Sequence, residues 1–175
     1  LLRDAGLSQQ AFELQSQMQK QAPEDVELAY DTALLAEKAG NTDEMERLLR
    51  DIIARKPDFQ HAYNALGYSY AERNIKLDEA QQLIQKALDL QPGDPFITDS
   101  LAWVHFRRGQ FDEAEKLLEQ AYATRQDAEI AAHLGEVLWA QNKRDRALQI
   151  WRQGLQTDSK NATLLETLKR LNVKP

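Results

Sequence analysis

Apolar and small residues recur along this chain with a period of about 34 positions. Pro23, Pro57 and Pro92 mark three successive periods, 34 and 35 residues apart. Each period contains two segments of about 14 residues whose apolar side chains are spaced by three and four, which is the pattern of an amphipathic α-helix. A fixed period filled by two helices and two turns is typical of stacked helix–turn–helix repeats. We therefore expect an all-α fold.

The small residues of the pattern fall where the two helices of a pair are expected to cross most closely. We expect Gly67 to face Ala80 and Gly135 to face Ala147. A larger side chain at such a crossing costs about 1–3 kcal/mol through overpacking. The positions expected to be constrained by the repeat are Gly67, Ala80, Ala87, Pro92, Ala114, Ala121, Gly135 and Ala147.

Turn and cap residues separate the helical segments. Gly40 and Gly109 follow first helices, where glycine ends a helix because it accepts a positive φ angle. Asp94 followed by Pro95 opens another first helix. We expect aspartate carboxylates to cap the free N–H groups of the second helices and to complement their dipoles. These aspartates are Asp43, Asp78, Asp112 and Asp145.

The last helical segment has the pattern of a cap on a helical stack, with one apolar and one polar face. Asn161 precedes it as the expected N-cap. The expected buried face contains Leu164, Leu165, Leu168 and Leu171, and the water-facing side contains Glu166, Thr167, Lys169 and Arg170. No comparable polar cap precedes residue 8, so we expect the N-terminal edge to continue into further repeats or to pair with another molecule.

The motif positions resemble those of the tetratricopeptide repeat. Its signature positions in the segment from residue 61 to residue 94 are occupied by Tyr63, Leu66, Gly67, Tyr70, Ala80, Ile84, Ala87 and Pro92. The resemblance implies a right-handed solenoid of stacked antiparallel helix pairs with a C-terminal capping helix. It divides the chain into the end of a truncated repeat (1–25), four repeats (26–59, 60–94, 95–127 and 128–161) and a capping helix with its tail (162–175).

The resemblance also implies a function: a non-catalytic scaffold that binds a protein or peptide in a concave groove lined by the first helices. The groove residues assigned in this way are Tyr30, Asn64, Tyr68, Phe96, Asp99, Trp103, Phe106, Arg107, His133 and Trp139. Aromatic and arginine side chains dominate protein interfaces. Packing between first helices explains Trp103 and Phe106 equally well, and it explains Trp139 better. Of the groove positions that clamp chaperone carboxylates in this family, only Asn64 matches, so that ligand is not expected.

Charge is distributed unevenly along the chain, which has a net charge of −6. Residues 1–140 contain 14 Lys and Arg against 25 Asp and Glu, whereas residues 141–175 contain 8 against 3. An acidic body repels phosphate, so we do not expect nucleic-acid binding. The basic end suits either an acidic partner or simple solvation. No apolar run approaches the length of a transmembrane helix, and cysteine is absent from the sequence.

No motif of catalysis is recognisable in the sequence. Glu129 and His133 lie four residues apart on one helical face, but two such side chains without a HExxH or cysteine motif are weak grounds for a metal site. His105 occupies a position between paired helices, where a structural role is favoured. Phosphate-binding loops and nucleophile elbows are also lacking. We therefore expect neither an enzyme nor a bound cofactor or metal.

Residues from about 55 to 171 resemble the C-terminal repeats of proteobacterial tetratricopeptide lipoproteins of the outer membrane. The departures are Ala102, where glycine is expected, and Gln126, where proline is common. One such lipoprotein is the adaptor of a periplasmic carboxyl-terminal processing protease. The resemblance implies that protease as a partner, and a periplasmic location through a lipid anchor upstream of Leu1, with the cytoplasm as the alternative. A structural or self-associating segment of a larger scaffold, and an accessory domain of an upstream enzyme, stay open.

Overall fold

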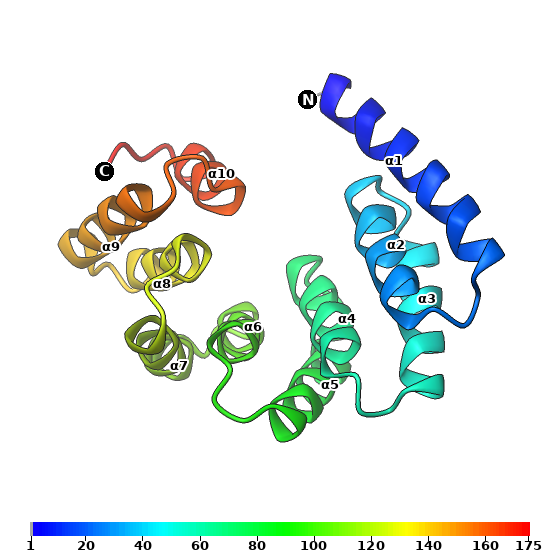
Figure 1. Ribbon diagram of the computed structural model, residues 1–175. Helices are drawn as coiled ribbons and strands as arrows, with labels where there is room; N and C mark the ends of the chain where they lie inside the picture. The colour runs from blue at the N-terminus through cyan, green and yellow to red at the C-terminus, as the bar shows by residue number, and fades with distance from the viewer. Residues whose placement is uncertain (1) are drawn as a thin grey trace. The chain divides into compact units, whose positions relative to one another are not determined.

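The computed structural model describes residues 2–175, and its regular secondary structure is helical throughout (Figure 1). The described helices are α1 (Leu2–Gln21), α2 (Val26–Lys38), α3 (Thr42–Arg55), α4 (Gln60–Glu72), α5 (Leu77–Leu90), α6 (Pro95–Arg107), α7 (Phe111–Thr124), α8 (Ala128–Ala140), α9 (Arg144–Thr157) and α10 (Ala162–Arg170). No strand occurs within residues 2–175, so the predicted all-α fold class is confirmed. None of the described helices is both long and apolar enough to span a lipid bilayer.

The chain forms two compact units, residues 1–66 and 67–175, and the boundary falls within α4. In the first unit, α2 packs against both α1 and α3. In the second unit, α6 pairs with α7 and α8 pairs with α9. The helices α5 and α6, α7 and α8, and α6 and α8 also touch, while α10 packs on α8 and α9. We call α2, α4, α6 and α8 the first helices and α3, α5, α7 and α9 the second helices.

Side-chain caps are found on the first helices α2, α6 and α8 and on α10, but not on the second helices. Oxygens of Asp25, Asp94 and Asp127 accept hydrogen bonds from N–H groups in the first turns of α2, α6 and α8, and Asn161 does the same for α10. The second helices begin without a side-chain cap hydrogen bond. The predicted caps are therefore wrong, because each aspartate lies inside the first turn, where it complements the helix dipole instead. These residues are Asp43, Asp78, Asp112 and Asp145.

First helices end at a residue of positive φ, which turns the chain towards the second helix. Gly40 and Gly109 have φ angles of +81° and +74°, as the sequence predicts. Asn74 and Asn142 occupy the corresponding places at +54° and +62°. The N–H that follows Gly109 donates over 2.9 Å to the carbonyl oxygen of His105, and the other three turns close in the same way. This bond satisfies a carbonyl at the helix end that has no intrahelical partner.

In the second unit, the helix pairs cross where a glycine leaves room for a large side chain. A Cβ atom on Gly135 would lie 2.1 Å from Nε1 of Trp151, and one on Gly67 would lie 2.6 Å from Cγ1 of Ile84. Ala80, which was predicted to face Gly67, contributes only its backbone oxygen to this contact. Ala147, which was predicted to face Gly135, is not among the nearest neighbours of that glycine. Trp151 is fully buried, and its indole N–H donates over 3.2 Å to the carbonyl oxygen of Ala132. Each glycine therefore makes room for a large side chain, Ile84 or Trp151, which lies one helical turn after the alanine predicted to face that glycine.

Seven of the eight positions that the repeat pattern singles out are buried, and the eighth lies in an exposed turn. The buried positions are Gly67, Ala80, Ala87, Ala114, Ala121, Gly135 and Ala147, and the exposed one is Pro92.

The capping helix α10 buries a slightly different face from the predicted one. Leu164 and Leu168 are buried as expected, but Leu165 is 45% exposed and Thr167 is only 4% exposed. Both assignments were wrong for one reason. Residues spaced by three and four share a helix face, and position 167 has this spacing to both 164 and 171, whereas 165 has it only to 168 and points further from the buried side.

We predict that Gly135→Ala destabilises the protein by about 1–3 kcal/mol, because the new methyl group collides with Trp151. In a Trp151→Leu background the same change should cost little or even stabilise, since alanine is favoured over glycine inside a helix by about 0.5–1 kcal/mol. Urea unfolding followed by circular dichroism measures the four free energies of this double-mutant cycle. An equal cost of Gly135→Ala in both backgrounds would show that Trp151 is not the obstacle.

Candidate functional site

The predicted groove residues are divided between the two compact units. In the first unit, the ring of Tyr30 on α2 meets the edge of Phe59 with centroids 5.5 Å apart. Asn64 on α4 is half-buried, and its side-chain oxygen has no hydrogen-bond partner among the described residues. The eight remaining groove residues belong to the second unit, which contains the more complete arrangement.

A cleft of about 300 Å³ lies within the second unit, between the first helices α4, α6 and α8 and the capping helix α10. Four predicted groove residues line it, namely Tyr68, Trp103, Arg107 and His133. Other residues that line the cleft were not among the predicted groove residues, and they include Glu72, Glu136, Thr163, Glu166 and Arg170. We refer to this feature as the α10 cleft.

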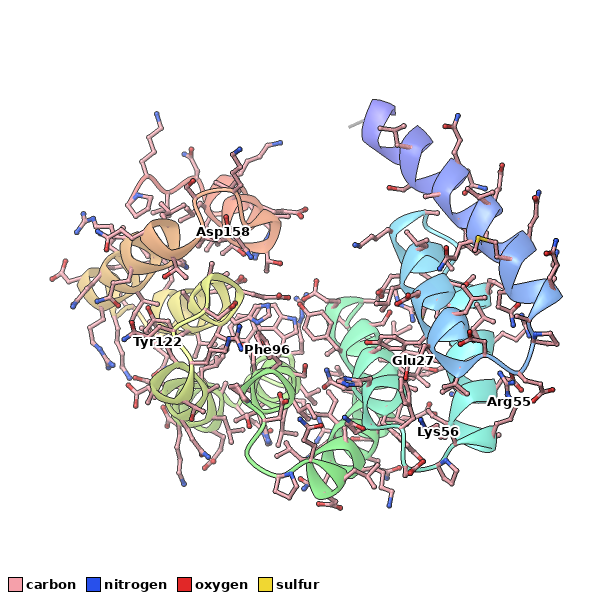
Figure 2. The ribbon with its side chains drawn as sticks, in the orientation of Figure 1. Glu27, Arg55, Lys56, Phe96, Tyr122 and Asp158 are labelled. Atoms are coloured by element: carbon pink, nitrogen blue, oxygen red, sulfur yellow. The ribbon has the colours of Figure 1, made fainter. Side chains whose placement is uncertain are left out.

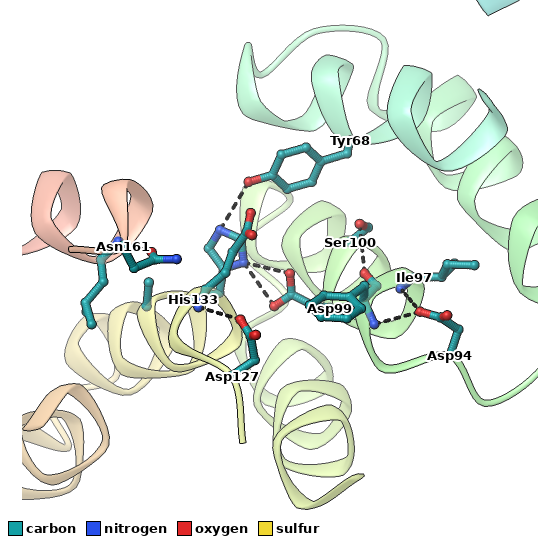
Figure 3. Close-up of polar contacts among 12 residues, drawn as sticks. Tyr68, Asp94, Ile97, Asp99, Ser100, Asp127, His133 and Asn161 are labelled. Atoms are coloured by element: carbon teal, nitrogen blue, oxygen red, sulfur yellow. Dashed lines mark hydrogen bonds and ion pairs between the residues drawn. The ribbon is translucent and has the colours of Figure 1, made fainter. Parts of the chain in front are cut away.

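His133 on α8 lines the α10 cleft, and we call it the polar floor of the cleft. Figure 3 shows its hydrogen bonds to Asp99 and Tyr68. Its Nδ1 lies 2.9 and 3.0 Å from the two carboxylate oxygens of Asp99 on α6, and its Nε2 lies 3.3 Å from the hydroxyl of Tyr68 on α4. Because a carboxylate only accepts, Nδ1 carries a proton and donates it to Asp99. Nε2 then accepts from Tyr68 when the imidazole is neutral and donates to it when the ring is charged. Three first helices are joined through this one ring.

The charge state of His133 is set by opposing effects. The side chain is 1% exposed, and burial by itself lowers the pKa of a histidine. The negative charge of Asp99 and its hydrogen bond oppose this effect, with further contributions from Glu129 and Glu72, and the pKa of His133 is raised overall. The imidazole of His133 therefore keeps its proton to a higher pH than an ordinary histidine does.

An aromatic stack lies against this floor. The ring of Trp103 stacks on His133 with centroids 4.2 Å apart and on Phe106 with centroids 4.8 Å apart. The guanidinium of Arg107 sits 5.0 Å from the Trp103 ring centroid and donates over 2.9 Å to the backbone carbonyl of Glu72. Trp103 is only 3% exposed. Its ring is therefore packed inside the second unit while it also lines the cleft.

Two buried N–H groups of the α10 cleft lack acceptors. Neither Nε1 of Trp103 nor Nε of Arg107 has a hydrogen-bond partner in the described part of the chain. A buried donor without a partner costs about 1–3 kcal/mol, and proteins avoid this situation unless the group has another role. A bound molecule with an acceptor oxygen would supply the missing partner.

The fourth wall of the cleft is provided by α10 and was not predicted. Arg170 of α10 donates a hydrogen bond over 2.5 Å to the carboxylate of Glu136 on α8. Glu136 is only 5% exposed. The sequence contains a signal for this contact. Glu136 and Arg170 are 34 residues apart, as are Asp99 and His133. Opposite charges at corresponding positions of successive periods therefore indicate side chains that meet.

Four predicted groove residues of the second unit do not line the α10 cleft: Asp99 and Phe106 contact residues of its lining, whereas Phe96 and Trp139 lie elsewhere. Phe96, labelled in Figure 2, has the guanidinium of Arg125 over its ring at 5.1 Å from the centroid. Trp139 lies under Arg144, whose guanidinium carbon is 3.6 Å from the ring centroid, and it contacts the ring of Trp151 with centroids 5.5 Å apart. Neither ring joins the stack around His133 in this structure.

The cleft combines hydrogen-bond donors, aromatic surface and carboxylates in one small space. Such a mixture suits the recognition of a polar polypeptide segment. Within residues 2–175, no group of three or more metal-ligating side chains is placed to hold a metal ion.

We predict that Asp99→Asn moves the pKa of His133 from above its ordinary value to below it. Burial is the largest single effect on this pKa, and without the carboxylate of Asp99 it is no longer outweighed, so it favours the neutral ring. An NMR titration of the imidazole signals of His133 measures this change. A His133 pKa that stays raised in Asp99→Asn would contradict the assignment of Asp99 as the main stabilising charge.

The same pair makes stability depend on pH with a definite sign. A raised pKa in the folded state contributes stability fully below the unfolded value of about 6.5, and this contribution is lost as the pH rises through the folded value. The difference in unfolding free energy between the unmodified chain and Asp99→Asn should therefore shrink on passing from mildly acidic to alkaline buffer. Urea unfolding across that range checks the trend.

Models of the tetratricopeptide repeat match residues 30–95, 76–135 and 105–171. A repeat-containing protein of Pseudomonas aeruginosa is 49% identical over 117 residues, which is 67% of this chain and 20% of that protein. The chain thus spans about a fifth of the length of this relative.

Solved structures of the same architecture cover nearly all of the chain. A thermophilic repeat protein of Thermus thermophilus superposes with a TM-score of 0.83 over 98% of this chain and 94% of its own, at 23% identity. An O-GlcNAc transferase mutant of Thermobaculum terrenum gives a TM-score of 0.61 at 24% identity over 65% of this chain and 22% of that enzyme. These likenesses confirm the predicted solenoid fold. Repeats of this kind generally mediate protein–protein interaction without catalysis, although they also occur within enzymes. This chain belongs to the tetratricopeptide repeat family.

Proposed function

We propose that this chain is part of a non-catalytic scaffold that binds a polypeptide partner in the α10 cleft. One observation carries the proposal: buried donors of Trp103 and Arg107 lack acceptors and line the same cleft. Polypeptide main chain is rich in carbonyl acceptors, and extended segments are common ligands of grooves lined by aromatic side chains. The protein-binding role of the family supports this assignment.

For the partner, we propose a periplasmic carboxyl-terminal processing protease, with this protein as its adaptor at the outer membrane. The support is the resemblance of residues 55–171 to the C-terminal repeats of lipoproteins with that role. The test mixes the full-length protein with the purified protease of the same bacterium and measures the mass of the complex by light scattering. Separate elution of the two proteins at micromolar concentration would refute this choice of partner and leave the scaffold itself open to another.

The location follows the same reasoning. We propose the periplasmic face of the outer membrane, reached through a lipid anchor upstream of Leu1, with the cytoplasm as the alternative. Cell fractionation followed by protease treatment of spheroplasts separates the two. An accessory role beside a catalytic region is the remaining alternative, since a similar array occupies 22% of the transferase chain.

We predict that Thr163→Trp weakens partner binding at least about tenfold, because the indole fills the α10 cleft and loses the partner's contacts there. The matched control is Gln85→Trp, an equally large change on the exposed side of α5, outside this cleft. Isothermal titration calorimetry measures both affinities, and circular dichroism verifies that both variants keep their helicity. Full affinity in Thr163→Trp would remove the α10 cleft from the proposed function.

A second candidate function, self-association, is favoured by the exposed face of α1. Leu14 and Met18 are 63% and 49% exposed. One repeat period later, the corresponding Leu48 and Ile52 of α3 are 1% and 0% exposed, beneath the small residues of α2. An apolar face of this kind needs a helix to cover it. A second copy of the chain could provide that helix.

We predict that the double substitution Leu14→Lys and Met18→Lys shifts the sedimentation mass from dimer to monomer, because charges replace the apolar contact. Leu165→Lys is the control, since Leu165 is similarly exposed on α10 but has no part in this face. An unmodified chain that sediments as a monomer at high micromolar concentration would exclude self-association through α1.

A further inference from the structure

We propose that the α10 cleft selects a basic segment of its polypeptide partner. A lysine or arginine side chain lies between Glu72 and Glu166, and a neighbouring main-chain carbonyl accepts hydrogen bonds from Trp103 and Arg107. This inference rests on the proposed function, and it adds the chemical class of ligand that the site takes.

The first support is an imbalance of charge in the cleft wall. Glu136 is neutralised by Arg170, but the carboxylates of Glu72 and Glu166 make no ion pair or hydrogen bond with any described residue, and both are exposed. Arg107 is the only other arginine of the lining. With the pair of His133 and Asp99 closed on itself, three glutamates face two arginines, and the wall carries a net negative charge.

The negative charges of Glu72 and Glu166 both act electrostatically on the guanidinium of Arg170. The pKa of Arg170 is raised first by its hydrogen bond to Glu136, with burial opposing, and then by the negative charges of Glu136, Glu72 and Glu166. Glu72 and Glu166 come from α4 and α10, on either side of the cleft, yet both influence this one guanidinium. A cation that enters between them meets two negative charges.

The second support is independent of charge. Nε1 of Trp103 and Nε of Arg107 belong to residues one helical turn apart, which share a face of α6 and both line the α10 cleft. Arg107 is held in position by its bond to the Glu72 carbonyl and by its contact with the Trp103 ring. The donors require an oxygen acceptor, while Glu72 and Glu166 repel an anionic one. A neutral peptide carbonyl beside a basic side chain satisfies both conditions.

The unpaired indole gives a direct readout of binding. Short peptides with blocked termini, identical except for a central Lys, Gln or Glu, are titrated into the ¹⁵N-labelled intact chain. We expect the Trp103 indole N–H signal to move downfield as it gains an acceptor. The Trp151 indole, already bonded to the Ala132 carbonyl, should not move. The Lys peptide should bind about threefold to tenfold more tightly than the Gln peptide, and the Glu peptide should bind most weakly.

Two variants test the carboxylates themselves. Glu72→Gln and Glu166→Gln should each weaken the Lys peptide about threefold and leave the Gln peptide unchanged, and added salt should reduce the preference for Lys. The control is Glu113→Gln, on the exposed side of α7 and outside the α10 cleft. It should change neither affinity.

Two results would overturn the inference. A Trp103 signal that no peptide moves removes the carbonyl contact. Equal affinity for the three peptides, with the signal moving, removes the selection for a basic residue but leaves the cleft as a peptide site, so that the proposed function stands. The proposed function falls by a different measurement, when Thr163→Trp keeps full affinity for the protein partner.

Discussion

The crossing of α8 and α9 at Gly135 sets the geometry on which the α10 cleft depends. A side chain at that position would overlap Trp151, so α8 approaches α9 more closely than any other residue would allow. Trp151 in turn bonds to the backbone of α8 through Ala132. His133 lies two residues from Gly135, and the helix directs it to the opposite side, towards Asp99 on α6. One side of α8 therefore packs in the core against α9, and the opposite side carries His133, the polar floor of the cleft.

Stacked repeats bring corresponding positions together, and this restricts which side chains can occupy them. Asp99 meets His133, and Glu136 meets Arg170, each pair 34 residues apart. Identical charges at such positions would repel in surroundings with little water, whereas opposite charges attract. The cleft thus requires neighbouring repeats to differ where they touch. Asp99 and His133, and Glu136 and Arg170, are therefore positions at which successive repeats differ in charge.

The preferences of single residues predicted the helices and turns well. The features that were predicted wrongly or left undecided depend on contacts between helices. Positive φ at Gly40 and Gly109 and the caps at Asp94 and Asn161 follow from the preferences of single residues. The second helices lack side-chain caps because their turns place each aspartate two positions after the N-cap, which no residue propensity reveals. The role of Trp103 stayed undecided for another reason. First helices both pack against neighbouring first helices and line the groove. An aromatic residue on such a helix is therefore compatible with packing and with ligand binding.

The helix that closes the stack also forms a wall of the cleft, through the bond from Arg170 to Glu136. Duplication of internal units lengthens an array of this kind, but it does not copy a site that needs the closing helix. A new unit placed between α9 and α10 would separate the two side chains and transfer α10 to a different neighbour. A repeat added there would therefore remove this cleft, whereas repeats added elsewhere in the array would lengthen the molecule and leave one such cleft per chain.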